Sequence, residues 1–137
     1  MTGIEPALRR AAPEDAETLA RLIDLAGEGI PAHLWRQAAR DGESVWDVGR
    51  QRAARESGGF SYRNAEVCEA QGRPAGMLLG YRQPDPYDAG DLDELPAIVR
   101  PLVELEALAP GSWYLNGLAV FPEFAGDWVL MTRSWTE

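Results

Sequence analysis

The sequence predicts a single α/β domain with a mixed, mostly antiparallel sheet flanked by helices. Apolar residues recur at helical spacing over the first third of the chain, and the period changes to two from about residue 61. A strongly strand-like segment, residues 113–121, follows a loop and a further helix. The length of 137 residues suits one domain, and 45% hydrophobic with 26% charged residues is ordinary for a globular protein. This succession of elements predicts the mixed fold.

The first half of the chain predicts one short strand, over residues 7–10, and three helices. Residues 13–15, Pro-Glu-Asp, open the first helix, since proline tolerates the first turn and acids suit the positive end of the helix dipole. Gly27 ends it. The second helix runs from Pro31 to Gly42, and the third from Ser44 to about Glu56. The apolar face of the first helix comprises Ala16, Leu19, Ala20, Ile23 and Ala26.

A β-hairpin is predicted next, with strands over residues 61–70 and 74–83 joined by a tight turn at Gln71-Gly72. Gly76 and Gly80 share one face of the second strand. A glycine inside a strand often marks a close approach, so we expect a helix or a ligand to lie against that face.

The segment between this hairpin and the last strand is predicted to be a loop followed by a helix. Residues 84–96 contain three prolines and five acidic residues, which indicates a solvated loop. The spacing of apolar residues from Ile98 to Leu105 predicts the helix. Pro110-Gly111 then separates the helix from the final strand.

Composition excludes several classes of function. Thirteen basic and 22 acidic residues give a net charge of −9, which argues against a nucleic-acid partner. The negative charge either serves solubility alone or favours cationic substrates such as amines. No apolar run approaches the roughly 20 residues of a membrane span, and residues 1–10 do not resemble a secretory signal. A single cysteine, Cys68, and a single histidine, His33, predict no disulfide, no metal site and a cytoplasmic location.

Two segments carry a family resemblance. Residues 112–124, Ser-Trp-Tyr-Leu-Asn-Gly-Leu-Ala-Val-Phe-Pro-Glu-Phe, resemble the fourth strand of the GNAT superfamily of N-acetyltransferases, where L-A-V-x-P-E-(Y/F) precedes a phosphate-binding loop. Residues 72–80, which begin Gly-Arg-Pro-Ala-Gly, resemble the G-x-x-V-G strand of that family. The similarity extends over about residues 7–124 and implies a GNAT-like fold.

The resemblance also implies an activity, the transfer of an acetyl group from acetyl-CoA to an amine. The acceptor would be a small molecule or a peptide, which the resemblance does not identify. In the family the fourth strand offers its free backbone edge to the cofactor's pantetheine arm. By resemblance, the backbone of Leu118, Ala119 and Val120 is therefore the cofactor-binding edge.

Five side chains are candidates for the acceptor site or for catalysis. Tyr114 and Asn116 share one face of the last strand by period two. Asparagine is no base and an ordinary tyrosine is protonated at neutral pH, so the amine would lose its proton through water or arrive deprotonated. Glu66 on the hairpin is a further candidate base, or simply a solvated strand residue. Trp35 and Trp46 lie on helices that border the acceptor pocket in the family, and core packing is the alternative.

The chain departs from the family after Phe124. The expected R-x-x-G-x-(G/A) loop is absent, although its amide groups would hold the cofactor's phosphates. With GC-rich codon choices, the segment from Ala125 onward can read Arg-Gly-Leu-Gly in another frame, which matches the start of such a loop but not its sixth position. We therefore interpret residues 1–124 as the N-terminal and central part of the domain, and residues 125–137 as an aberrant tail produced by a frameshift that removed the C-terminal elements.

The absence of those elements predicts an alternative to an enzyme. The fourth strand would be an exposed sheet edge, which favours association. Residues 128–132, Trp-Val-Leu-Met-Thr, have strand-like composition and would pair with this edge in the same chain or in a second copy. The alternative is thus a non-enzymatic remnant that forms a homodimer, with exchanged tails as one arrangement.

Overall fold

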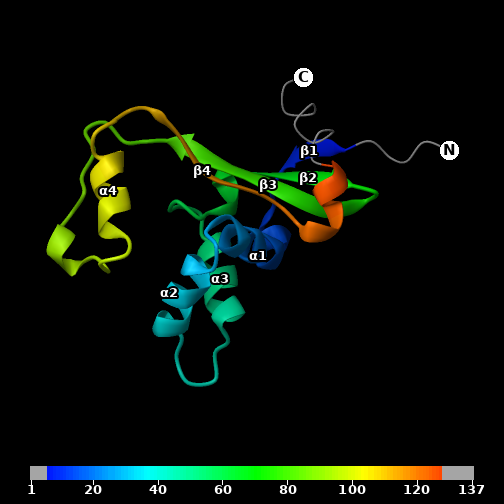
Figure 1. The fold of residues 1–137 in the computed structure, drawn as a ribbon, viewed down its shortest axis with the longest axis horizontal. Helices are drawn as coiled ribbons and strands as arrows, with labels where there is room; N and C mark the ends of the chain where they lie inside the picture. Colours follow the sequence, from blue (N-terminus) through cyan, green and yellow to red (C-terminus); the bar gives the residue numbers. More distant parts are fainter. Residues whose placement is uncertain (1–5, 128–137) are drawn as a thin grey trace.

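The structure is a computed structural model that describes residues 6–127. Its centre is a four-stranded antiparallel sheet in the order β1-β2-β3-β4 (Figure 1). The strands are β1 (Ala7–Arg10), β2 (Ala65–Ala70), β3 (Arg73–Arg82) and β4 (Trp113–Val120). The predicted fold class is confirmed.

Three helices connect β1 to β2 and lie together on one side of the sheet (Figure 1). They are α1 (Ala16–Ala26), α2 (Ile30–Ala38) and α3 (Val45–Ala53). A fourth helix, α4 (Arg100–Glu106), lies between β3 and β4 in the chain and stands apart from the other three. Each predicted helix is present, and within residues 6–127 no helix is long and apolar enough to cross a bilayer.

The main core lies between α1 and the sheet. Leu19, Leu22 and Ile23 on α1 are at most 3% exposed, because every third or fourth residue of this helix faces the sheet. Val67 and Met77 belong to the same cluster and are fully buried on neighbouring strands. This packing fixes which face of β2 and β3 lies toward the helices.

A second, smaller cluster forms on the opposite face of the sheet. Phe124 is 2% exposed and packs with Cys68, Ala70 and Ala75. Phe124 belongs to a 3₁₀ helix over Pro122–Asp127, so the chain folds back onto the sheet directly after β4. Burial raises the pKa of the Cys68 thiol, in agreement with an inert core cysteine. Residues 128–137, with their predicted strand pairing, lie outside the described residues.

One local prediction is wrong, and of a second prediction the helix half is wrong while the ligand half stays a prediction. The strand expected from residue 61 begins at Ala65, because the Ser61 hydroxyl donates to the Arg55 carbonyl and accepts from the Arg63 amide, which holds a 3₁₀ turn. Gly76 and Gly80 face no helix; a Cβ atom on Gly76 would lie 2.7 Å from the carbonyl oxygen of Ala119. The close approach at these glycines is therefore made by the backbone of β4.

Candidate functional site

β4 contains a β-bulge at Asn116. Leu79 of β3 pairs with Gly117, and the next residue, Gly80, pairs with Leu115. Asn116 is therefore an extra residue of β4 that has no pairing partner on β3. A bulge bends the strand and redirects a side chain, and bulges are frequent beside active sites. The bulge divides β4 into the segment 113–115 and the segment 117–120.

A largely apolar cavity of about 410 Å³ lies beside this bulge. One wall is formed by α1 and α2, where Leu34 and the buried indole of Trp35 contribute. The opposite wall comes from the segment before β4, through Ile98 and Leu102. Both Tyr114 and Asn116 line the cavity from β4. Its size and apolar lining are typical of small-molecule sites.

Three tyrosines and one carboxylate form a polar cluster next to the cavity. The rings of Tyr81 and Tyr114, paired across β3 and β4, meet edge to face with centroids 5.6 Å apart. The Tyr87 hydroxyl donates to Glu106 Oε2 at 2.7 Å. Burial, followed by a hydrogen bond to Glu106, raises the pKa of Tyr114 to about 12. Tyr114 therefore keeps its proton at neutral pH and is available as a hydrogen-bond donor.

The structure brings together three of the four predicted substrate-pocket residues. Trp35, Tyr114 and Asn116 line the same cavity, whereas Trp46 is not part of its lining. Trp46 instead packs edge to face on Trp35, with ring centroids 6.4 Å apart, and the Arg21 guanidinium lies 4.4 Å from the centre of its ring. Trp46 thus supports Trp35 from behind.

The predicted cofactor edge follows the bulge directly. Leu118 and Val120 are half-buried, and Ala119 is buried and pairs with Met77. Within residues 6–127, β4 is the last strand of the sheet, and only one of its edges is paired. The backbone of these three residues therefore continues from the cavity along an outer edge of the sheet.

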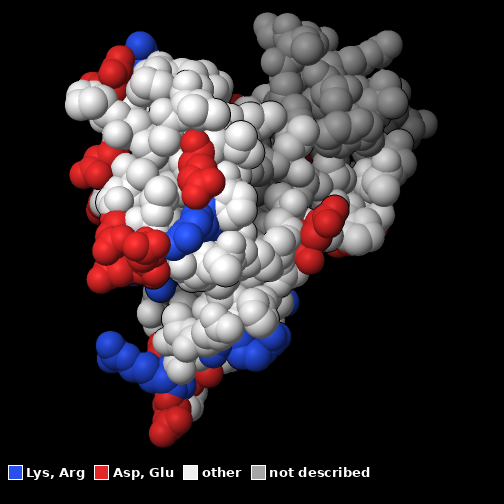
Figure 2. Space-filling view, turned by 60° about the vertical axis from the view of Figure 1, so that its left-hand side comes forward, with Lys and Arg blue, Asp and Glu red and all other residues white. Residues whose placement is uncertain are grey.

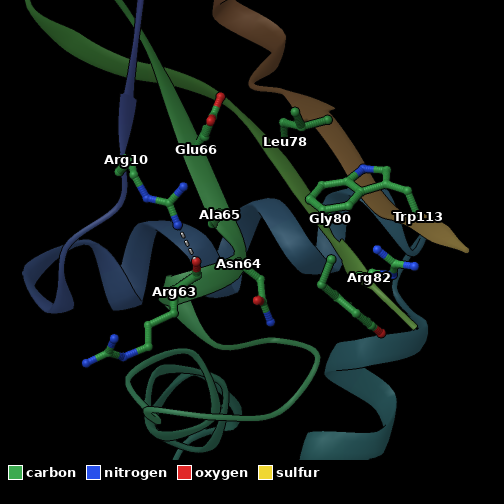
Figure 3. Close-up of a pocket in the computed structure, with 10 residues that line it drawn as sticks. Arg10, Arg63, Asn64, Ala65, Glu66, Leu78, Gly80, Arg82 and Trp113 are labelled. Carbon is green, nitrogen blue, oxygen red and sulfur yellow. Dashed lines mark hydrogen bonds between the residues drawn. The ribbon is translucent and has the colours of Figure 1, made fainter. Parts of the chain in front are cut away.

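Glu66 lies on the other face of the sheet. It lines a separate pocket of about 220 Å³ with Arg10, Arg82 and Trp113 (Figure 3). In this pocket the Arg10 guanidinium donates to the Arg63 carbonyl at 2.8 Å. Because the neighbouring residues Ala65 and Val67 face the helices, the sheet separates Glu66 from the cavity beside Asn116.

Sequence reasoning missed Glu106, Tyr87 and Tyr81. Tyr81 had a usable signal, because it shares its β3 face with Met77 and Leu79 and its register places it opposite Tyr114. Glu106 and Tyr87 had none, since they are 19 residues apart and meet only because the segment between β3 and β4 folds back on itself.

Comparison with known proteins supports the fold. No family model matches the chain, and no curated protein matches it. One similar solved structure is described as an acetyltransferase, with a TM-score of 0.60 and 20% identity over 94% of this chain and 70% of that one. Another is an N-acetyltransferase from Staphylococcus aureus Mu50, with a TM-score of 0.56 and 17% identity over 94% and 72%. The chain therefore has the fold of these acetyltransferases.

Proposed function

We propose that this protein is an N-acetyltransferase that moves the acetyl group of acetyl-CoA to a primary amine. The observation that carries this proposal is the bulge at Asn116, which joins the outer backbone edge of 117–120 to the cavity in one continuous site. The fold, which the chain shares with two acetyltransferases, supports the same reaction class.

In this proposal the cofactor lies along the outer edge of β4. Backbone groups of Leu118, Ala119 and Val120 exchange hydrogen bonds with the amide groups of the pantetheine arm. The thioester then lies at the bulge, beside the cavity that holds the amine. Much of the rate enhancement comes from this juxtaposition of two reactants, which replaces a bimolecular encounter.

The chemical step forms a C–N bond and breaks a C–S bond. The neutral amine attacks the thioester carbonyl carbon, and the tetrahedral intermediate expels the coenzyme A thiolate. The proton of the amine nitrogen moves to the Tyr114 hydroxyl oxygen as the Tyr114 proton moves to Glu106. Tyr114 and Glu106 line one small pocket next to the cavity, and Glu106 accepts a hydrogen bond from Tyr87 there. The thiolate takes a proton from solvent.

A second candidate function is self-association through β4. This strand has no charged residue, and Trp113 and Leu115 on it are 72% and 52% exposed. Natural edge strands are usually protected by charges or prolines, so an uncharged edge favours pairing with a second copy. The homodimer predicted from the sequence would use this edge.

The deciding experiment is thermal unfolding of the full chain with and without acetyl-CoA, with an adenine nucleotide as the control ligand. A ligand that binds only the folded state stabilises it by about 2.7 kcal/mol at 100 times its dissociation constant. We expect a dose-dependent rise in Tm with acetyl-CoA. No rise at millimolar acetyl-CoA would reject the enzyme proposal and favour self-association.

A further inference from the structure

The cavity beside Asn116 has no charged residue in its lining. Its polar side-chain groups are confined to the indole of Trp35, the hydroxyl of Tyr114 and the amide of Asn116. The rest of the lining is aliphatic or aromatic, with Leu34, Phe60 and Leu102 as examples. A molecule that fills this volume must therefore be apolar over most of its surface.

The approach to the cavity is acidic. The segment between β3 and β4, residues 83–112, supplies one wall of the cavity and carries seven acidic residues and one arginine. Figure 2 shows acidic side chains spread over this face of the molecule, with a basic side chain among them and further basic side chains gathered at its lower end. A negative approach raises the local concentration of cations, so a protonated amine is favoured over an anion of the same size.

The polar groups that could hold an amine lie at the β4 end. The half-buried Asn116 offers a carbonyl oxygen as an acceptor, and Tyr114, which reaches the carboxylate of Glu106, lies two residues away. At the opposite end, Ile30 and Leu34 on α2 and Ile98 before α4 offer no side-chain partner for a second polar group.

We propose that the acceptor is a primary amine with an apolar alkyl or aryl body and no second charge. This inference rests on the proposed acetyl transfer and names the substrate class of the same cavity. The amine lies at Asn116, where it meets the thioester, and the body extends toward α2 and α4. Diamines and polyamines are disfavoured, because the apolar lining offers their second charge no partner.

A matched pair of ligands tests the inference directly. Hexylamine and 1,6-diaminohexane have the same carbon chain and differ in one ammonium group. Calorimetric titration of the full chain should show hexylamine binding at least about tenfold more tightly, since the second ammonium of the diamine would lose hydration against an apolar lining that gives it no partner. Equal affinities, or tighter binding of the diamine, would overturn the proposal.

A matched pair of variants places the effect in the cavity. Leu102→Glu adds a carboxylate to the wall, at a position that is already 46% exposed. It should weaken hexylamine binding and strengthen diamine binding, because the distal ammonium gains a partner. Leu108→Glu makes the same charge change at a residue that is 79% exposed and outside the cavity lining, and it should leave the ratio of the two affinities unchanged.

A variant on another element controls for the case that Leu102→Glu alters binding by changing α4 itself. Ile30→Glu, on the opposite wall, should reverse the preference in the same direction. If Leu108→Glu changes the preference as much as the cavity variants do, general surface charge governs binding and the inference is wrong.

Release of coenzyme A thiol separates this inference from the proposed function. Faster release with hexylamine than with 1,6-diaminohexane supports both. Release with the diamine but not with hexylamine refutes the substrate class and leaves acetyl transfer in place. Absence of release with any amine, together with no binding of acetyl-CoA, refutes acetyl transfer. The difference in affinity between hexylamine and 1,6-diaminohexane then tests on its own whether the cavity prefers a singly charged amine.

Discussion

Tyr114 is the side chain that links the cavity to the charged cluster. It lines the cavity from β4, packs on Tyr81 and reaches Glu106. Glu106 in turn accepts a hydrogen bond from Tyr87. A raised pKa keeps the Tyr114 proton in place at neutral pH, so the hydroxyl can pass a proton on only as it receives another. The environment of this residue, more than its identity, suits it to a relay.

Replacing Tyr114 tests the relay. Tyr114→Phe removes the hydroxyl and keeps the ring, and we expect kcat to fall about 10²-fold or more, the usual contribution of a positioned proton-transfer group. KM for the amine should change much less than kcat, because Asn116 still lines the cavity and can hold the amine. Tyr81→Phe is the matched control, because its ring packs on Tyr114 outside the cavity lining. Equal losses in the two variants would assign Tyr114 a packing role.

Gln83 offers a second test on a single residue. Its side chain is 4% exposed, and its Nε2 atom has no hydrogen-bond partner within the described part of the chain. Burying an unpaired amide costs about 1–3 kcal/mol. Gln83→Met should therefore raise the free energy of unfolding in urea by that order. Gln37→Met, on an exposed residue of α2, should have little effect, and a loss of stability at position 83 would show that the amide has a partner.

The carboxylate of Asp15 joins β1 to the start of α1. It accepts from Arg9 at 2.8 and 2.9 Å and from the Ala12 amide at 2.7 Å, and its side chain is 11% exposed. The hydrogen bonds from Arg9 lower the pKa of Asp15 against the opposing effect of burial. The folded state thus favours the ionised form, which adds stability above the ordinary pKa of 3.8 and loses it as the pH falls below that value.

Unfolding as a function of pH tests this connection. At pH 7, Asp15→Asn should lose about 1.5–3 kcal/mol, the range for hydrogen bonds to charged groups. As the pH falls from about 4 to about 2 the wild type should lose more stability than the variant, because only the wild type must protonate this carboxylate. Asp41→Asn, an exposed loop residue with no hydrogen bond or ion pair within residues 6–127, is the control and should follow the wild type.

At the scale of whole elements, the sequence predicts those strand bounds, helix ends, turns and caps that depend only on nearby residues. β1 coincides with its predicted range, and Gly27 ends α1 as expected. The turn at Gln71-Gly72 has positive φ at both residues, as a two-residue hairpin turn requires. Ser44 caps α3 by accepting from the Asp47 amide. Each of these features depends on neighbours within a few residues.

The parts of the site that depend on long-range placement could not be predicted. Nothing near Asn116 marks a bulge, because the extra residue exists only relative to β3. The alternation along β2 places Glu66 on the face opposite to Ala65 and Val67. Which of the two faces carries the cavity depends on where α1 and α2 pack. The segment before β4 was expected to be a solvated loop and a helix, and its contribution to the cavity wall depends on how it folds back.

For the molecule as a whole, the edge formed by β4 decides between the two functions. Acetyl-CoA and a second copy of the chain would both use its unpaired backbone, so each would exclude the other over residues 117–120. Leu115 is exposed on this strand, and a charge placed there opposes edge-to-edge pairing. We predict that Leu115→Lys abolishes concentration-dependent dimers in sedimentation velocity. Leu108→Lys, which changes a more exposed leucine outside β4, should leave the sedimentation of the chain as it is in the wild type. Dimers that persist in Leu115→Lys would show that the interface lies elsewhere. The outer edge of β4 would then be free to bind the cofactor.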